Sequence, residues 1–266
     1  MNKLGQFRNI VGKLVCFAYF GLSSVFASFI IFPLIQVFIR EKKVRYNAKM
    51  AVVRGHFSLF ISLMFWLAHY KIDTSAMQKY KDMRSTVVVA NHPSLIDIVV
   101  LISAVPRPDC IVAGRLFNNL WIRKIVGQLF VNSFANTEEL LERCRKSLHD
   151  GNNMIIFPEG TRTRPEIAGK PLKRGAAQIA LRAGADVLPI HIKTENLVGL
   201  GKHESLFKVH THGYAQLTLE PHTMLTIDTF NHEPFAQAAR TLTEAIRNTI
   251  FVEDVCERQR RYPKRD

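Results

Sequence analysis

Apolar residues dominate the N-terminal quarter of the chain, and no charged residue occurs from Leu14 to Ile39. At a rise of about 1.5 Å per residue, a helix over this run is long enough to cross a bilayer core of about 30 Å. A secretory signal peptide is the alternative, because Lys3 and Arg8 precede the run. The run is too long for a signal core and has no small-x-small cleavage site before Arg40, so the pattern favours a retained membrane helix.

A second apolar segment extends from His56 to His69 and is rich in aromatic residues. It is too short to span a bilayer comfortably, so we expect an interfacial or hairpin-forming helix rather than a second crossing. The basic stretch Arg40–Arg45 indicates that the chain after Ile39 is cytoplasmic. Residues 1–70 are therefore predicted to be membrane-anchoring helices. In the alternative interpretation, both helices pack on the remaining domain as part of its core.

Residues 71–266 show a different pattern, in which short β-branched runs alternate with helical segments. The polar segment Lys71–Arg84 predicts a connector. The strands expected after it are Thr86–Ala90, Asp109–Ala113, Leu129–Val131, Met154–Phe157 and Asp186–Ile192, then Lys208–His212, Gln216–Leu219 and Met224–Ile227. The helices expected are Ser94–Ala104, Leu120–Val126, Thr137–Asp150, Arg174–Ala183 and Pro234–Val252. This alternation predicts an α/β domain with a mixed, mostly parallel sheet and helices on both of its faces.

The formal net charge of +14 indicates anionic partners. A nucleic acid is disfavoured, because the chain has no zinc-finger, helix-turn-helix or aromatic-plus-basic recognition pattern. Together with the apolar N-terminus, the charge favours an anionic membrane surface. The four cysteines are dispersed and form no Cys-x-x-Cys pair, so we expect no metal site, no disulfide framework and a reducing compartment.

The block Asn91–Asp97 lies between an expected strand and an expected helix. His92 stands at the strand end, and Asp97 follows within reach of it across the first helical turn. Asp97 would accept the Nδ1 proton and fix the tautomer, which leaves Nε2 to take a proton from a hydroxyl group. We therefore expect His92 to be a general base that Asp97 orients. The alternative is a structural histidine that caps the helix.

The block Phe157–Arg162 leaves another expected strand in a sharp turn. Glu159 can hydrogen-bond the hydroxyl groups of a substrate or buttress the loop. Arg162 can clamp an anionic group through bidentate contacts. Gly160 permits a close approach of the backbone, and Thr161 can add a hydroxyl contact. Taken alone, Glu159 and Arg162 would form a surface ion pair of little energetic consequence.

His-x4-Asp followed by Phe-Pro-Glu-Gly-Thr-Arg resembles the glycerolipid acyltransferases, whose best-known members acylate 1-acylglycerol-3-phosphate. The resemblance covers roughly Val87 to Ile192 and includes Leu188-Pro189-Ile190, which matches the family's fourth block, a strand end. It implies that substrate is bound by Glu159, Gly160, Thr161, Arg162 and also Arg115, which stands where many members have lysine.

One position departs from the family pattern. The family's Gly-x-x-Phe-Ile-x-Arg block is matched by Gly127–Ser133, so Ser133 stands where the family has an arginine associated with phosphate binding. The substitution leaves the proton-transfer chemistry untouched. It weakens the expectation that the acceptor carries a phosphate at the usual place.

The resemblance implies an O-acyltransferase that moves a fatty acyl group from an acyl thioester to the hydroxyl of a lysophospholipid. The acceptor expected first is 1-acyl-sn-glycerol-3-phosphate, and the product is phosphatidic acid. Acyl-CoA or acyl carrier protein would be the co-substrate, with no other cofactor. The expected partners are this donor and membrane lipids, and the expected place is the inner membrane, with the catalytic domain facing the cytoplasm.

Two alternatives stay open. The first keeps the same chemistry on a non-phosphate acceptor, such as another lysolipid, an amino-acid lipid or a lipid-like secondary metabolite. The second is a non-catalytic membrane lipid-binding protein.

Overall fold

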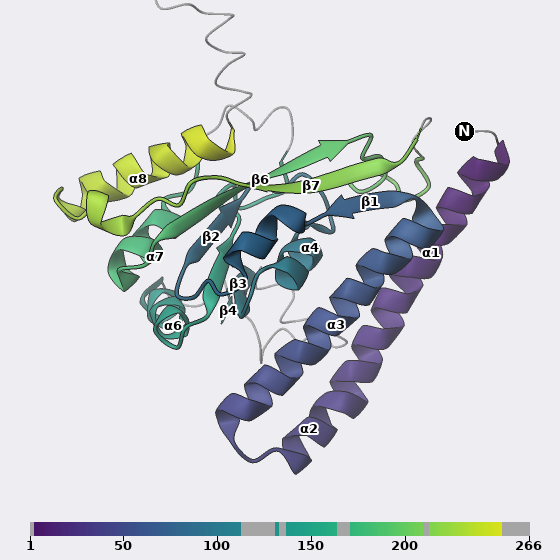
Figure 1. Ribbon diagram of the computed structural model, residues 1–266, viewed down its shortest axis with the longest axis horizontal. Helices are drawn as coiled ribbons and strands as arrows, with labels where there is room; N and C mark the ends of the chain where they lie inside the picture. The colour runs from purple at the N-terminus through teal and green to yellow at the C-terminus, as the bar shows by residue number, and fades with distance from the viewer. Residues whose placement is uncertain (1–2, 113–130, 133–136, 164–170, 210–212, 252–266) are drawn as a thin grey trace, which may run out of the picture.

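A helical hairpin projects from an α/β domain in the computed structural model, which describes residues 3–112, 131–132, 137–163, 171–209 and 213–251 (Figure 1). The first arm is α1 (Lys3–Phe26), a π-helical segment (Ala27–Ile31) and α2 (Phe32–Phe38). The chain then turns, and α3 (Lys42–Ala68) returns along α1. By length and composition, Leu4–Phe38 and Lys42–Ala68 could each cross a membrane.

Close contact between α1 and α3 depends on a glycine at one end of the hairpin. A Cβ built at Gly12 would lie 2.0 Å from the carbonyl oxygen of Leu67, so only glycine lets the two backbones approach this closely. The Asn9 amide also donates to the carbonyl oxygen of Ala68. These contacts fix the hairpin at the end where α3 passes into the sheet.

Within the described residues, seven strands form one sheet in the order β1-β7-β6-β2-β5-β3-β4. All neighbours are parallel except β6 and β7, which are antiparallel. The strands are β1 (Tyr70–Asp73), β2 (Val87–Ala90), β3 (Pro108–Val112), β4 (Val131–Asn132), β5 (Asn153–Ile156), β6 (Val187–Glu195) and β7 (Ala215–Pro221). A parallel strand is covered on both faces, which explains why β2 and β5 are apolar at nearly every position.

The sheet separates two hydrophobic cores. Val88 and Ala90 of β2 enter the core shared with α4 (Asp97–Ala104) and the hairpin. Val87 and Val89 point to the other core. That second core is covered by α6 (Thr137–His149), α7 (Gly175–Ala183) and α8 (Phe235–Ile250). Helices therefore cover both faces, as expected from the sequence (Figure 1).

Most elements predicted after residue 84 are present with shifted ends. These are β2, β3, β5, β6, β7, α4, α6, α7 and α8. The predicted strand Leu129–Val131 overlaps β4 only at its last residue, since residues 113–130 lie outside the described part of the chain. The predicted helix Leu120–Val126 also lies outside it.

Two predictions about elements were wrong, and a third is contradicted at the two of its residues that the structure describes. The polar connector Lys71–Arg84 contains β1 and a 3-10 helix (Ser75–Tyr80), because an edge strand with one neighbour tolerates polar residues. Met224–Ile227 makes only one bridge, from Leu225 to Val187. Lys208 and Val209 are not in a strand, and the rest of that predicted strand lies outside the described residues.

The predicted layout of the N-terminal helices also needs correction. The second apolar segment does form a hairpin, but α3 begins at Lys42 and is long enough to span, because basic residues also favour helix. Residues 40–45 lie at the tip of the hairpin, while the α/β domain lies at the other end (Figure 1). The basic stretch therefore does not lead directly into the domain, as a single crossing would require.

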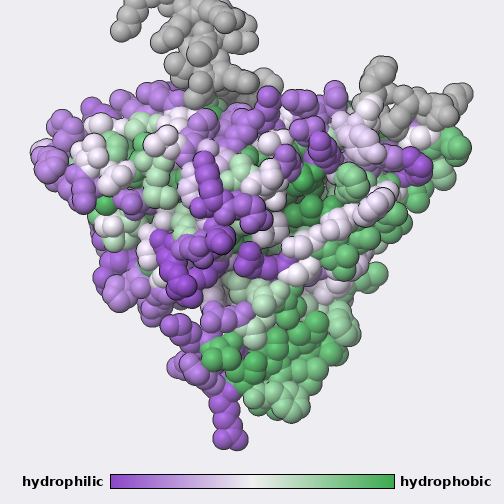
Figure 2. All heavy atoms as spheres, in the orientation of Figure 1, coloured by the Kyte–Doolittle hydropathy of each residue, from purple (hydrophilic) through white to green (hydrophobic). Residues whose placement is uncertain are grey.

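Large apolar side chains stay exposed along the hairpin. They are Leu4, Phe7, Val11, Leu14, Val15, Leu22, Phe26, Phe29, Ile30, Leu34, Val37, Phe38, Val44, Leu59, Phe65, Trp66 and Leu67. Figure 2 shows hydrophobic residues gathered over the projecting hairpin and hydrophilic residues over the side that carries α6 to α8. Such a contiguous apolar surface is characteristic of contact with lipid or with another apolar surface.

Candidate active site

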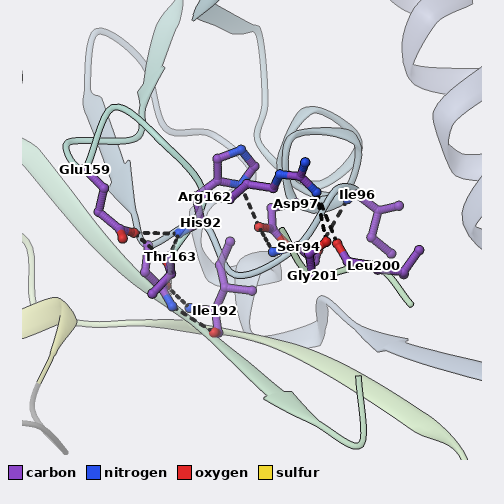
Figure 3. A network of polar contacts seen from close by, with 11 residues as sticks. His92, Ser94, Ile96, Asp97, Glu159, Arg162, Thr163, Ile192, Leu200 and Gly201 are labelled. Carbon is purple, nitrogen blue, oxygen red and sulfur yellow. Dashed lines mark hydrogen bonds and ion pairs between the residues drawn. The ribbon is translucent and has the colours of Figure 1, made fainter. Parts of the chain in front are cut away.

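His92 and Asp97 form a hydrogen-bonded pair between β2 and α4. His92 follows the end of β2, and Asp97 is the first residue of α4. The distance from His92 Nδ1 to Asp97 Oδ2 is 2.7 Å (Figure 3). The imidazole retains 20% of its exposure, while the carboxyl group is fully buried. One edge of the imidazole therefore faces a carboxyl group, and part of the ring stays open to an incoming molecule.

Ser94 completes the surroundings of the Asp97 carboxyl group. Its backbone N–H donates to Asp97 Oδ2 over 2.7 Å, and its hydroxyl donates to Asp97 Oδ1. Burial raises the pKa of Asp97, and the hydrogen bonds from His92 and Ser94 oppose that rise. A carboxyl group that faces only donors is suited to accept the Nδ1 proton of His92, an arrangement that would leave Nε2 as the acceptor nitrogen.

Phe157 holds the other side of the imidazole. The two rings stack with centroids 4.1 Å apart and an interplanar angle of 16°. Phe157 directly follows β5, the strand beside β2. The two polar blocks of the sequence thus meet at the carboxyl ends of neighbouring parallel strands, where α/β proteins commonly place their sites.

Glu159 and Thr163 clamp the backbone of His92. The backbone N–H of His92 donates to Glu159 Oε1 and to Thr163 Oγ1, each over 2.9 Å. Thr163 Oγ1 donates to Glu159 Oε1 over 2.6 Å, and the Thr163 N–H donates to the carbonyl oxygen of His92. Burial raises the pKa of Glu159, and the Thr163 hydroxyl opposes the rise. Glu159 therefore buttresses the loop, one of the two roles expected for it.

Gly160 adopts a backbone conformation that favours glycine, with φ of +68°. A Cβ built at Gly160 would lie 2.5 Å from Nζ of Lys173. The Lys173 N–H also donates to the carbonyl oxygen of Pro158 over 2.9 Å. The glycine thus leaves room for a lysine ammonium group directly over the turn.

Arg162 and Thr161 contact a loop that sequence reasoning did not connect with the site. Arg162 NH1 lies 3.2 Å from the carbonyl oxygen of Gly201 and 3.5 Å from that of Leu200 (Figure 3). Lys202 Nζ donates to Thr161 Oγ1 over 2.5 Å. The loop follows β6 and lies far along the chain from the blocks, and no motif at residues 200–202 signals these contacts.

Two further residues prove structural. The Asn91 side chain donates to the carbonyl oxygen of Ile192 and accepts from its N–H, over 3.0 and 2.6 Å, and so pairs with β6 beyond the end of β2. Pro189 was expected at a strand end, but it lies inside β6, paired with Val89. Leu188 and Ile190 beside it are fully buried in the core.

The structure brings together His92, Asp97, Glu159, Gly160, Thr161 and Arg162. Arg115, Ser133 and most of the Gly127–Ser133 block lie outside the described residues. Within the described part of the chain, no group of three or more His, Cys, Asp or Glu residues could hold a metal ion.

Residues 71–193 match the family model described as Acyltransferase. The chain is 27% identical over 142 residues to a 1-acyl-sn-glycerol-3-phosphate acyltransferase of Borreliella burgdorferi, a match that covers 51% of this chain and 56% of that protein. It is 33% identical over 132 residues to one of Chlamydomonas reinhardtii, covering 46% of this chain and 39% of that protein. The chain thus spans about half or less of these relatives' own length.

The whole chain also superposes on a solved structure. The 1-acyl-sn-glycerophosphate (LPA) acyltransferase of Thermotoga maritima matches with a TM-score of 0.66 and 22% identity, over 98% of this chain and 100% of that one. This similarity includes the hairpin and confirms the fold. Residues 71–193 therefore match the acyltransferase family model, and the fold of the chain is that of this solved structure.

Proposed function

We propose that the protein transfers a fatty acyl group from an acyl thioester to the hydroxyl of 1-acyl-sn-glycerol-3-phosphate. The observation that carries this proposal is the hydrogen-bonded pair His92–Asp97, which supports a role for Nε2 as the basic nitrogen. The matched relatives support the acceptor, since their names state the same activity. A binding module has no need of a partly exposed imidazole held by a buried carboxylate.

Each catalytic step follows from the pair. His92 Nε2 takes the proton of the acceptor hydroxyl as its oxygen attacks the thioester carbonyl carbon, because a neutral alcohol is a poor nucleophile. Asp97 stabilises the imidazolium that forms. The C–S bond then breaks, and the leaving thiolate takes the proton back from Nε2. These steps need no metal and no covalent acyl-enzyme.

The turn Gly160–Arg162 is the proposed acceptor site. Glu159 and Thr163, which flank this turn, accept hydrogen bonds from the backbone N–H of His92, so the turn lies beside the imidazole. Thr161 and Arg162 supply a hydroxyl and a guanidinium group, which suit a hydroxylated, anionic headgroup. Arg115 stays a proposed contact on the resemblance alone. The donor is proposed to be acyl-CoA or acyl carrier protein.

The hairpin is proposed to hold the enzyme at the inner membrane with the α/β domain in the cytoplasm. Its exposed apolar side chains suit contact with acyl chains, where both the lipid acceptor and the acyl group of the donor partition.

A second candidate keeps the chemistry but changes the acceptor to a lipid without phosphate. Ser133 favours it, because a serine stands where the resemblance expects a phosphate-associated arginine. The two candidates differ in one respect that can be measured, which is whether turnover requires a phosphate group on the acceptor.

The test is an assay of purified, detergent-solubilised protein with both donors and with acceptors that carry or lack phosphate. We expect wild-type turnover of lysophosphatidic acid, and a loss of kcat of about 10²-fold or more in His92→Ala, as for removal of a general base. His232→Ala is the matched control, because this histidine is exposed outside the site. Full turnover by His92→Ala would contradict the proposal, and turnover confined to phosphate-free acceptors would favour the second candidate.

A further inference from the structure

The loop Leu197–Lys208, which follows β6, is held against both the hairpin end and the site. Tyr70, which follows α3, donates its hydroxyl to the carbonyl oxygen of Val198 over 2.9 Å. The N–H of Leu95, in the block that carries the base, donates to the carbonyl oxygen of Leu200 over 2.9 Å. The loop is thus positioned by residues on two sides.

A carboxylate within the loop sets its conformation. Glu204 Oε2 accepts the backbone N–H groups of Gly199 and Gly201, over 2.8 and 3.0 Å. Gly199 has a φ of +88°, which favours glycine at the turn. The buried Lys13 of α1 donates to the carbonyl oxygen of Lys208. Side chains that this loop presents are therefore held in place.

Three cationic side chains meet at the turn Gly160–Arg162, two from other segments and one from the turn itself. Lys202, half-buried, reaches Thr161 from the β6–β7 loop. Lys173 places its ammonium group over Gly160 from the segment before α7. Arg162 belongs to the turn itself, and its NH1 donates to the carbonyl oxygen of Gly201 beside Lys202. Convergent cations beside a hydroxyl are a suitable environment for a phosphate group.

We propose that Lys202 binds the phosphate of the lipid acceptor together with Arg162 and Lys173, and so determines specificity for phosphorylated acceptors. This inference rests on the proposed function. The phosphate of the acceptor suits the site, because it is esterified to the oxygen on the carbon next to the one that carries the reacting hydroxyl. The phosphates of coenzyme A lie far from its thioester, at the other end of the pantetheine arm.

The test compares steady-state kinetics of the full chain with lysophosphatidic acid, with 1-acylglycerol and with acyl-CoA. Lys202→Met should raise KM for lysophosphatidic acid roughly tenfold to hundredfold, as for loss of a hydrogen bond to a charged group. It should leave KM for 1-acylglycerol and for acyl-CoA within about twofold, and Lys202→Arg should recover most of the loss. Lys208→Met, which removes an exposed lysine of the same loop, should match wild type.

Three results would overturn the proposal: an unchanged KM for lysophosphatidic acid, an equal rise for both acceptors, or a rise confined to acyl-CoA. The second would indicate a structural role, and the third a contact with the donor. If the wild-type protein turns over lysophosphatidic acid, none of these three results contradicts the proposed function.

A binding measurement separates the site from the function. His92→Ala protein is titrated with mixed micelles that contain lysophosphatidic acid or 1-acylglycerol. A preference for the phosphorylated lipid that disappears in His92→Ala/Lys202→Met would support the site, even if wild type did not turn over lysophosphatidic acid. Equal binding of both lipids by His92→Ala would overturn it.

Discussion

At the scale of single residues, the site depends on one carboxyl group that is buried among donors. Asp97 accepts from His92 Nδ1, from the Ser94 N–H and from the Ser94 hydroxyl. An asparagine fills the same volume but carries no charge, and its amide presents a donor where one oxygen now accepts.

We therefore expect Asp97→Asn to lower kcat by about 10²- to 10⁴-fold, because the imidazolium loses its counter-charge and its tautomer is no longer fixed. KM for the acceptor should change little. The measurement is kcat and KM with lysophosphatidic acid, beside Asp150→Asn, which removes a carboxylate from an exposed ion pair. A wild-type kcat in Asp97→Asn would exclude the orienting role.

Local contacts of this kind can be predicted from sequence, and distant ones cannot. His92 and Asp97 lie only five residues apart along the chain, between a strand and a helix, so spacing alone predicts their pairing. Glu159 reaches the backbone of His92 because the two blocks follow neighbouring parallel strands, β5 and β2. The contact between Lys202 and Thr161 joins two loops whose meeting depends on the order of strands in the sheet, which no local pattern specifies.

At the scale of elements, β3 carries a buried acid with no role in the proposed reaction. Asp109 is 7% exposed, and it accepts from the Ser147 hydroxyl of α6 over 2.6 Å and from the Cys110 N–H over 2.8 Å. Burial raises the pKa of Asp109 to about 6, although both hydrogen bonds oppose the rise. The free energy that this contact between β3 and α6 contributes to folding therefore depends on pH.

The sign of this linkage follows from the two pKa values. Below the unfolded value of 3.8, both states hold the proton. As the pH rises from that value to about 6, Asp109 ionises in the unfolded state but still holds its proton in the folded state. The free energy of unfolding therefore falls with rising pH, by up to about 3 kcal/mol in all. Above about 6, both states are ionised and no further change occurs.

Thermal unfolding in detergent from pH 4 to pH 7 tests this linkage. The Tm of Asp109→Asn minus that of wild type should increase with pH up to about 6 and then stay level, because the asparagine does not titrate. Asp82→Asn, at an exposed position, should show no such trend. A difference for Asp109→Asn that stays constant across the range would contradict the linkage.

Elements with both faces buried were predicted most reliably. The apolar runs of β2 and β5 follow from burial between two cores, which is why each run alone predicts a strand. The edge strand β1 escaped prediction because Lys71 and Asp73 are polar and only β7 pairs with it. Helix α3 was predicted too short because its first turns carry charge rather than apolar residues.

At the scale of the whole molecule, the hairpin and the sheet share one hydrophobic core. Cys16 of α1 and Met64 of α3 belong to the same cluster as Val88 of β2 and Leu188 of β6. The sequence predicted two units that meet near residue 70, and it left open whether the helices pack on the domain. The structure shows that they do, while much of their apolar surface remains exposed.

This shared core means that the hairpin is part of the catalytic fold as well as a contact with lipid. A protein shortened to residues 71–266 would expose the sheet face that holds Val88 and Leu188, and would lose the Lys13 contact with the β6–β7 loop. We expect such a protein to aggregate, or to unfold at a lower temperature and turn over even a short-chain, water-soluble acceptor less well. Calorimetry and an assay with that acceptor would check this, and a stable, fully active fragment would contradict it. Production of a soluble form of the protein would therefore require keeping the hairpin and replacing its exposed apolar side chains by polar ones.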